Sequence, residues 1–515
     1  MAVTSAVPGF GNGSVSYGVR TNTGAWRTAT LSVGDVAYSV EQDTATIPGL
    51  TFIGTMPQVV AQDNWTTTFT FVNKGAASAQ MRLNTVGDAS DPGGIGVLPL
   101  LFSFPQQTDS SGPLLAWEFD RTLAGNALLV ADTAGPQTPP ALVGSADLTA
   151  TGPVDGFAIF HEIVTTQEAV VPMETRNASS YLLAFDNTNG QVLGVAVENV
   201  PPVDAVIPVI IRDDTGLVIS APGASISLPG NAHTSLVLSD PVRGFPVTAN
   251  IRGTIEFNTP ASGRISVLGL RFTPPNNALT TIPALANVGT GGGSIAHMAS
   301  GGDGWQTTFV LVNTGTSAAQ FTLSFFADQT GAPLSLPLAF PQTGEGPSTV
   351  ASSVSQMLAA GATLIIVSSG APQLLTGSAQ LTTAGYISGF VIFRHNGQEA
   401  VVPLESRNAS GYIIAFDNTN GTYTGIAVNA VSTGQVNIPV TVRDSTGATI
   451  AADTITLNAN GHYAFTLVTD RYPGTANIRG TIEFDTPAGA QIGALGIRVP
   501  NVPAHTYTTL PALAK

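Results

Sequence analysis

The chain has 515 residues and a formal net charge of −15, yet only 10% of its residues are charged, where soluble domains usually carry roughly 25%. Its 56 glycines and 35 prolines argue against an all-α fold, and the absence of cysteine excludes disulfides, thiolate metal sites and cysteine nucleophiles. The few basic residues form no patch that would bind nucleic acid, and no apolar run reaches the ~18 residues of a membrane-spanning helix. We therefore expect no nucleic-acid partner and no membrane insertion.

The first 50 residues differ from the rest, and we predict a partial β-domain over 1–50. From Gly11 to Gln42 the alternation of apolar and polar residues predicts two or three strands. So few strands cannot bury a core by themselves. The opening residues MAVTS have neither the basic nor the apolar region of a secretion signal, so none is expected in this sequence.

Residues 9–42 resemble the C-terminal half of a BACON domain, a bacterial sandwich often attached to secreted carbohydrate-active proteins. The first half of the family's domain has no counterpart, so the resemblance implies a truncated domain. Binding to carbohydrate or mucin is proposed for the family from context, and the resemblance therefore implies a link to glycans. The matching residues are Gly11, Gly13, Tyr17, Asn22, Arg27, Leu31 to Val33, Gly34 and Tyr38 to Gln42.

The remaining sequence is duplicated. Residues 156–197, GFAIFHEIVTTQEAVVPMETRNASSYLLAFDNTNGQVLGVAV, return at 389–428 as GFVIFRHNGQEAVVPLESRNASGYIIAFDNTNGTYTGIAV. Downstream of the first copy, ANIRGTIEFNTP returns as ANIRGTIEFDTP. Self-similarity on this scale indicates an array of folded units rather than one large catalytic domain.

Each copy of the duplication itself contains two similar units. A landmark of Gly, Ser or Thr, an apolar residue, a polar residue and Leu or Phe occurs four times, at spacings close to the ~100 residues of an immunoglobulin-like domain. Short apolar alternation broken by turn residues predicts strands between the landmarks. We therefore predict an all-β chain of four tandem immunoglobulin-like antiparallel β-sandwiches, arranged as a duplicated pair with short linkers. The four units are A1 (51–173), B1 (174–287), A2 (288–405) and B2 (406–515).

Residues 51–515 also resemble uncharacterised secreted repeat modules at the ends of large bacterial extracellular proteins. The resemblance rests on the G-W-x-T-T-F-x-L-V-N opening at Gly304, the EAVVPLE strand at Glu399 and the FDNTNG turn at Phe416. It implies export and an accessory role outside the cell or on its surface.

Two tryptophans occupy equivalent positions in the duplication. Trp65 follows Asp63 and Trp305 follows Asp303, and each tryptophan stands beside threonines. Exposed aromatic rings flanked by polar groups can stack on sugar rings, so these four residues are candidates for carbohydrate binding. The alternative is that each tryptophan belongs to the core of its sandwich.

An acidic turn is also duplicated. Asp186 and Asn189 lie in the sequence FDNTNG, which returns with Asp417 and Asn420. Calcium binds such oxygen-rich loops, although it requires six to eight ligands and this sequence lacks the full spacing of a calcium loop. The alternative to a calcium or ligand site is a hairpin in which Asn-Gly supplies positive φ angles.

Residues for catalysis are harder to find, and we predict none by name. The duplicated acids Glu168 with Glu174 lie six residues apart, about 20 Å along a strand, whereas the two carboxylates of a glycosidase lie about 5 to 9.5 Å apart. Glu399 with Glu405 repeats this spacing. His161 is expected in a loop after the GFAIF strand, and no metal or serine-hydrolase motif is present.

These observations favour a non-enzymatic, secreted or cell-surface repeat protein that acts in adhesion, carbohydrate binding or extracellular assembly. Its expected partners are a polysaccharide or cell-surface glycan, and further copies of itself through strand addition by the incomplete N-terminal strands. No cofactor is expected, and calcium at the acidic turns is the alternative. The alternative is an extracellular hydrolase of polysaccharide or polyester whose site lies in a groove between units.

Overall fold

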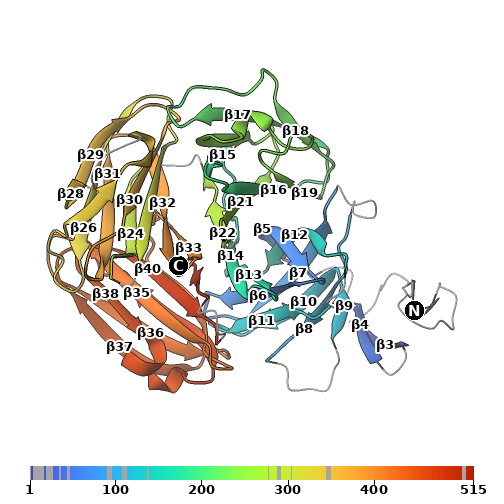
Figure 1. Ribbon diagram of the computed structural model, residues 1–515. Helices are drawn as coiled ribbons and strands as arrows, with labels where there is room; N and C mark the ends of the chain where they lie inside the picture. Colours follow the sequence, from blue (N-terminus) through green and yellow to red (C-terminus); the bar gives the residue numbers. More distant parts are fainter. Residues whose placement is uncertain are drawn as a thin grey trace.

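The computed structural model describes residues 2–3, 17–18, 27–33, 36–42, 47–89, 96–106, 113–135, 139–275, 278–286, 291–302, 304–343, 349–501 and 506–515. Nearly all of the regular structure is antiparallel β-sheet, so the all-β prediction is confirmed, as is the prediction of tandem β-sandwiches. The strands form pairs of facing sheets, and Figure 1 shows these sandwiches arranged around a common centre. No helix within the described ranges is long and apolar enough to cross a membrane.

Unit A1 has a four-stranded sheet in the order β10-β7-β12-β5, facing a sheet in the order β14-β13-β6-β11-β8-β9. Buried and more exposed residues alternate along strands such as β7, and the buried side chains form the core between the two sheets. Its strands are β5 (Thr51–Ala61), β6 (Trp65–Asn73), β7 (Ala79–Gly87), β8 (Leu100–Ser103), β9 (Leu114–Ala116), β10 (Glu118–Leu123), β11 (Leu128–Thr133), β12 (Leu142–Ala150), β13 (Val154–Glu162) and β14 (Gln167–Pro172).

In unit B1, a sheet with the strand order β18-β17-β20-β15-β23 faces a sheet with the strand order β19-β16-β21-β22. Its strands are β15 (Ser180–Asp186), β16 (Val192–Asn199), β17 (Ala205–Asp213), β18 (Ser225–Leu228), β19 (Ala232–Val237), β20 (Arg252–Asn258), β21 (Ile265–Thr273), β22 (Ala278–Pro283) and β23 (Leu285–Ala286), with a 3₁₀ turn, η1 (Pro246–Thr248).

Unit A2 repeats A1, with the orders β24-β31-β26-β29 and β28-β27-β30-β25-β32-β33. Its elements are β24 (Gly293–Ser300), β25 (Gln306–Asn313), β26 (Ala319–Ala327), β27 (Leu336–Ala339), η2 (Pro341–Thr343), β28 (Thr349–Ala351), β29 (Ser353–Leu358), β30 (Thr363–Ser368), β31 (Leu375–Thr383), β32 (Ile387–His395) and β33 (Gln398–Pro403).

Unit B2 repeats B1, with the orders β37-β36-β39-β34-β42 and β38-β35-β40-β41. Its elements are β34 (Gly411–Asp417), β35 (Tyr423–Val431), β36 (Val436–Asp444), β37 (Thr449–Leu457), β38 (His462–Thr466), a π-helical turn η3 (Leu467–Arg471), η4 (Pro473–Thr475), β39 (Arg479–Asp485), β40 (Gln491–Val499), β41 (Thr508–Leu510) and β42 (Leu513–Ala514).

The N-terminal segment adds strands to unit A1. β3 (Arg27–Val33) and β4 (Val36–Gln42) form an antiparallel hairpin, and β4 continues the larger A1 sheet by a parallel bridge from Ser39 to Leu114. A short pair, β1 (Ala2–Val3) with β2 (Tyr17–Gly18), precedes them. The described strands of the predicted partial domain thus pair with unit A1 of the same chain, through β4 and β9, and strand addition between copies stays a prediction.

The units pack sheet against sheet, so several sheets are buried on both faces. On β13, Ala158 and Phe160 face the A1 core, whereas Phe157 and Ile159 join the core of B2. Strands covered on both faces give nearly continuous apolar sequences rather than strict alternation. This packing explains both the repeated GFxIF and EAVVP sequences and the low content of charged residues.

The first and last units contact each other, so the array closes into a ring (Figure 1). The Leu128 amide of A1 donates to the Ser445 carbonyl of B2 at 2.9 Å, and the Lys74 ammonium donates to the Ala514 carbonyl at 2.6 Å. At the centre, β14 and β33 each contact β22 and β41. The sequence predicted tandem units but contained no indication that their two ends would meet.

Candidate functional site

Two cavities of about 200 Å³ each lie between units, at equivalent places in the ring. Pocket 1 lies between A1 and B2 and is lined by β6, β11, β13 and β14 of A1 and by the β34–β35 turn, β39 and β40 of B2. Pocket 2 lies between A2 and B1 and is lined by β25, β30, β32 and β33 of A2 and by the β15–β16 turn, β20 and β21 of B1. The duplicated sequence therefore forms the same cavity twice.

The acidic turns form one wall of each pocket. Asp417 accepts hydrogen bonds from the Thr419 amide at 2.9 Å and from Arg479 Nε at 2.8 Å. Asp186 accepts equivalent bonds in pocket 2, from the Thr188 amide at 3.0 Å and from Arg252 Nε at 2.9 Å. Each ion pair fixes the turn against the neighbouring strand of its own unit.

The predicted hairpin at these turns is wrong. Asn189 and Asn420 do have positive φ angles of 55° and 54°, as an Asn-Gly turn requires. However, β15 pairs with β20 and β23, whereas β16 pairs with β19 and β21, so the turn carries the chain from one sheet to the other. The reason is that the two apolar strands on either side of the turn belong to the two facing sheets of the sandwich. The turn therefore crosses the end of the sandwich from one sheet to the other. This places its polar side chains at the mouth of the pocket.

A second ion pair crosses each unit interface. In pocket 1, Arg498 Nε of B2 lies 3.1 Å from Glu168 Oε2 of A1, and in pocket 2, Arg271 Nε of B1 lies 3.1 Å from Glu399 Oε2 of A2. The two glutamate side chains are only 4% and 2% exposed. Buried carboxylates need such charged partners, because desolvation of an unpaired charge is very costly. The pairs therefore set the relative position of the two units around each pocket.

The acids that the sequence singled out lie in different places. Glu168 and Glu399 line pockets 1 and 2, while Glu174 and Glu405 line a separate cavity of about 480 Å³ near the ring centre. There, each of these two glutamates pairs with an arginine two residues further along the chain, at 2.5 Å. The spacing argument against one intrastrand catalytic pair agrees with this separation.

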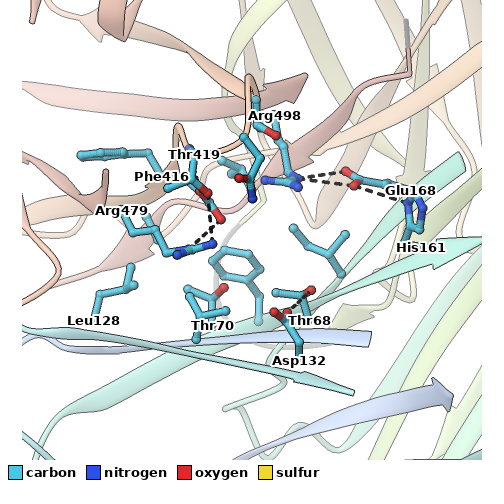
Figure 2. A pocket seen from close by; sticks show the side chains of 18 residues that line it. Thr68, Thr70, Leu128, Asp132, His161, Glu168, Phe416, Thr419, Arg479 and Arg498 are labelled. Carbon is cyan, nitrogen blue, oxygen red and sulfur yellow. Dashed lines mark hydrogen bonds and ion pairs between the residues drawn. The ribbon is translucent and has the colours of Figure 1, made fainter. Parts of the chain in front are cut away.

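Pocket 1 has two ionisable residues that are different residues in pocket 2. Asp132 lies opposite Thr68, and the Thr68 hydroxyl donates to it at 2.6 Å (Figure 2). Burial raises the pKa of the Asp132 carboxyl, and the bond from Thr68 offsets only part of this shift. In pocket 2, the position opposite Thr308 is Val367. This wall of pocket 2 is therefore apolar where pocket 1 is acidic.

The second difference concerns His161. It lies in β13, opposite Glu168, with its Nδ1 3.7 Å from a glutamate oxygen, so the predicted loop position is wrong. The strand continues past GFAIF because the pairing with β14 extends to residue 162. In pocket 2, the residue opposite Glu399 is Arg394. Figure 2 shows His161, Glu168 and Arg498 together at one end of pocket 1.

The tryptophans lie outside both pockets. Trp65 and Trp305 are half-buried and pack against the cores of A1 and A2. The Trp305 ring stacks on His395, with centroids 4.3 Å apart and planes 6° apart, so one of its faces is covered. Asp63, beside Trp65, has a φ of 54° and is partly exposed. Asp303 lies outside the described residues.

Comparisons with protein-family models, with curated proteins and with solved structures found no match to this chain. The resemblances to a BACON domain and to secreted repeat modules therefore stay predictions.

Metal ligands are not grouped in the described part of the chain, where no three His, Asp or Glu side chains are placed to hold one ion. In the acidic turns, Asp186 and Asp417 already accept bonds from an arginine and a threonine. Calcium binding at these turns stays a prediction that would require these bonds to be replaced.

None of the five pocket arginines was singled out from the sequence, although a signal was present for four of them. Arg252 and Arg479 occupy the same position of the repeated ANIRGTIEF sequence, and Arg271 and Arg498 occupy matching positions near the ends of β21 and β40. Arginines are scarce here and alternate with apolar residues in buried strands. Such positions require an acidic partner, and that requirement could have linked these arginines to the duplicated acids.

The other two interfaces between units, A1–B1 and A2–B2, each contain a buried histidine. At A1–B1, His233 Nδ1 lies 3.2 Å from Asp88, and its Nε2 lies 2.9 Å from Gln58. At A2–B2, His462 Nδ1 lies 2.9 Å from Asp328 and its Nε2 lies 3.0 Å from His297 Nδ1. The two copies are thus the same except that His297 replaces a glutamine. Burial and the neighbouring histidine lower the pKa of His297 to about 3.

The A2–B2 interface is therefore expected to be acid-labile, and His297→Gln to reduce this lability. A histidine with a folded pKa of about 3 and an unfolded pKa of 6.5 binds fewer protons when folded, so its stabilisation is present above pH 6.5 and is lost as the pH falls toward 3. The fall in unfolding free energy between pH 7 and pH 4 is expected to be about 3 kcal/mol smaller in the variant. Denaturant titrations at both pH values measure it, and Gln58→His at A1–B1 should have the opposite effect.

Proposed function

We propose that this chain is a non-enzymatic, secreted or cell-surface carbohydrate-binding scaffold, whose two interunit pockets hold sugar residues. The observation that carries this proposal is the duplication of one polar cavity at two equivalent interfaces. Catalysis needs one site with a special set of groups, whereas binding to a repetitive polymer gains from two similar sites held at a fixed distance.

The lining of the pockets fits a sugar ring. Pocket 1 is lined by the hydroxyl and amide groups of Thr68, Thr70 and Asn420 and also by the apolar side chains of Leu128 and Ile159. A sugar presents hydroxyl groups at its edge and C–H groups on its faces, so it requires such a mixture. The volume of about 200 Å³ is below the ~300–1,000 Å³ of pockets for drug-sized ligands, and therefore favours one ring of a chain.

Replacing the turn asparagines tests this proposal. Asn189→Gly and Asn420→Gly remove an amide from each pocket while keeping the positive φ angle. Loss of one hydrogen bond of about 0.5–1.5 kcal/mol should raise the Kd two- to tenfold. Binding is measured by calorimetry and by retention on insoluble polysaccharides, with released sugar assayed in the same tubes.

The control is Asn231→Gly, which makes the same change at an exposed residue with a φ of 51° outside both pockets. It should leave the Kd unchanged. A panel of soluble and insoluble glycans that shows no retention at all, or equal Kd values for the three variants and the unchanged chain, would contradict the proposal. Loss of binding on Trp65→Phe or Trp305→Phe alone would move the site to the tryptophans.

A hydrolase is the second candidate, and one observation favours it. Asp132 and His161 occur in pocket 1 and not in pocket 2, and the raised pKa of Asp132 is a property of general acids. Release of sugar or of an acid from polymer would support this candidate, and Asp132→Asn should then abolish the release. Retention without release supports the scaffold.

A further inference from the structure

The two pockets share one framework but differ in charge. The side chains that line pocket 2 include three arginines and two carboxylates, which gives a net charge of +1. Those of pocket 1 include two arginines, three carboxylates and His161, which gives −1 when the histidine is neutral. The difference arises at two positions only, because Arg394 and Val367 in pocket 2 replace His161 and Asp132.

Arg394 is the arginine of pocket 2 whose charge is not matched. Arg252 pairs with Asp186, and Arg271 pairs with Glu399, each through its Nε. Among the described residues, Arg394 forms no ion pair within 4.0 Å, and a terminal nitrogen donates to the Pro274 carbonyl at 3.3 Å. Although Glu399 lies opposite Arg394 across β32 and β33, its Oε2 accepts from Arg271 and from a threonine of B1.

We propose that pocket 2 recognises a carboxylate group carried by an acidic sugar residue, and that pocket 1 does not. This rests on the proposed function, and it adds the chemical class of the ligand. A half-buried guanidinium without an acid partner offers parallel N–H donors, which match the two oxygens of a carboxylate. The net charge of +1 suits a monoanion, and the amide groups of Asn189, Gln191 and Gln306 remain for the hydroxyl groups of the ring.

The remaining wall of pocket 2 supports the same ligand. Val310, Ile365 and Val367 supply an apolar surface on which the C–H face of a sugar ring can pack. Because this surface also excludes water, the attraction between Arg394 and the bound carboxylate is stronger than it would be in solvent. In pocket 1, Asp132 occupies the same wall and would repel a carboxylate when ionised.

The test is calorimetric titration with glucuronate and galacturonate, beside the neutral sugars glucose and galactose and the simple anions lactate and sulfate. The uronates are expected to bind at one site per chain, more tightly than the neutral sugars, and with an affinity that falls as salt is added. Arg394→Gln should weaken uronate binding at least tenfold, and should weaken it much more than it weakens the binding of neutral sugars. Arg243→Gln, which removes an exposed arginine outside both pockets, is the matched control and should change neither.

A gain of function completes the test. Asp132→Val together with His161→Arg gives pocket 1 the residues of pocket 2 at the two positions where their charges differ, and should raise the uronate stoichiometry from one to two. Melting curves confirm that each variant remains folded.

The outcomes separate this inference from the proposed function. Neutral sugars that bind as tightly as uronates, or an unchanged uronate Kd in Arg394→Gln, would overturn the carboxylate assignment while sugar binding stands. Binding of lactate that needs Arg394, without binding of any sugar, would support the carboxylate site and reject the carbohydrate class. Absence of binding by every sugar and anion would reject both proposals.

Discussion

Replacing Phe157 with aspartate is expected to open the ring. Phe157 is 1% exposed and lies on the face of β13 that packs against B2, not on the face that forms the A1 core. A buried carboxylate without a partner is strongly unfavourable, and separation of A1 from B2 would return it to water. The radius of gyration should rise well above the roughly 24 Å of a compact chain of 515 residues. Small-angle scattering measures this change.

Phe390→Asp is the matched control. Phe390 is 2% exposed and holds the same place at the interface between B1 and A2. These two units follow one another in the chain, so the short connection between β23 and β24 keeps them together when their packing is lost. Both variants should melt at lower temperature, whereas only Phe157→Asp should expand. Equal radii for the two variants would show that the contact between A1 and B2 does not close the ring.

Milder truncation gives a second measure of the same contact. Phe157→Ala leaves the charge unchanged and removes a buried ring, which typically costs about 3–5 kcal/mol. We expect this variant to stay compact at low temperature and to expand before its sandwiches unfold on heating. Scattering and circular dichroism as functions of temperature separate the two steps.

Much of the fold follows from local patterns. Alternation and turn residues indicate short antiparallel strands. The duplication indicates two equivalent copies, and the landmark that recurs within each copy indicates four units. The EAVVP sequence of β14 shows the limit of this reasoning. A strand buried on both faces reads as a continuous apolar run, so its sequence reveals burial but not which unit covers each face.

Closure of the ring depends on contacts between residues that are far apart in the sequence. Leu128 and Ser445, which form one of the closing hydrogen bonds, belong to the first and last units and show no local signal. The same holds for the ion pair between Glu168 and Arg498. The sequence could place Glu168 in a strand, but its partner is set by the angles between units, which local patterns do not encode.

The candidate site was predicted in part. The turns at Asp186 and Asp417 were singled out for their oxygen-rich side chains, and they do line the two interunit pockets. Their arginine partners were not predicted. The distinguishing residues, Asp132 and Arg394, lie at positions where the copies differ, and comparison of copies by similarity alone does not draw attention to them.

Differences between the copies also distinguish the A1–B1 interface of the first copy from the A2–B2 interface of the second. At A1–B1, two carboxyl groups belong to Asp147 of β12, which is partly buried, and to Glu198 of β16, which is fully buried. Gln380 and Asn429 hold these positions at A2–B2. Burial, only partly offset by a hydrogen bond from Thr55, raises the pKa of Asp147 to about 6. Burial and the charge of Asp147 raise the pKa of Glu198 well above its usual value. The interface is therefore favoured when the pair is protonated.

Asp147→Asn with Glu198→Gln is expected to stabilise the chain at neutral pH and to leave it unchanged in acid. A carboxyl group with a folded pKa of about 6 and an unfolded pKa of 3.8 binds more protons when folded, so its stabilisation is full below pH 3.8 and is lost as the pH rises through 6. The neutral amides avoid this loss, which corresponds to about 3 kcal/mol at pH 7 for Asp147 alone. Denaturant or thermal unfolding at pH 7 and pH 4 measures the difference.

The reverse change at the other interface is the control. Asn429 is fully buried, so Asn429→Asp should lower the unfolding free energy at pH 7, and most of that loss should be recovered at pH 4. Together the two variants test whether the carboxyl pair, rather than the general acidity of a chain with a net charge of −15, governs the pH response of the A–B interfaces. If the amide variant kept the same dependence on pH as the unchanged chain, the charges responsible would lie elsewhere in the ring.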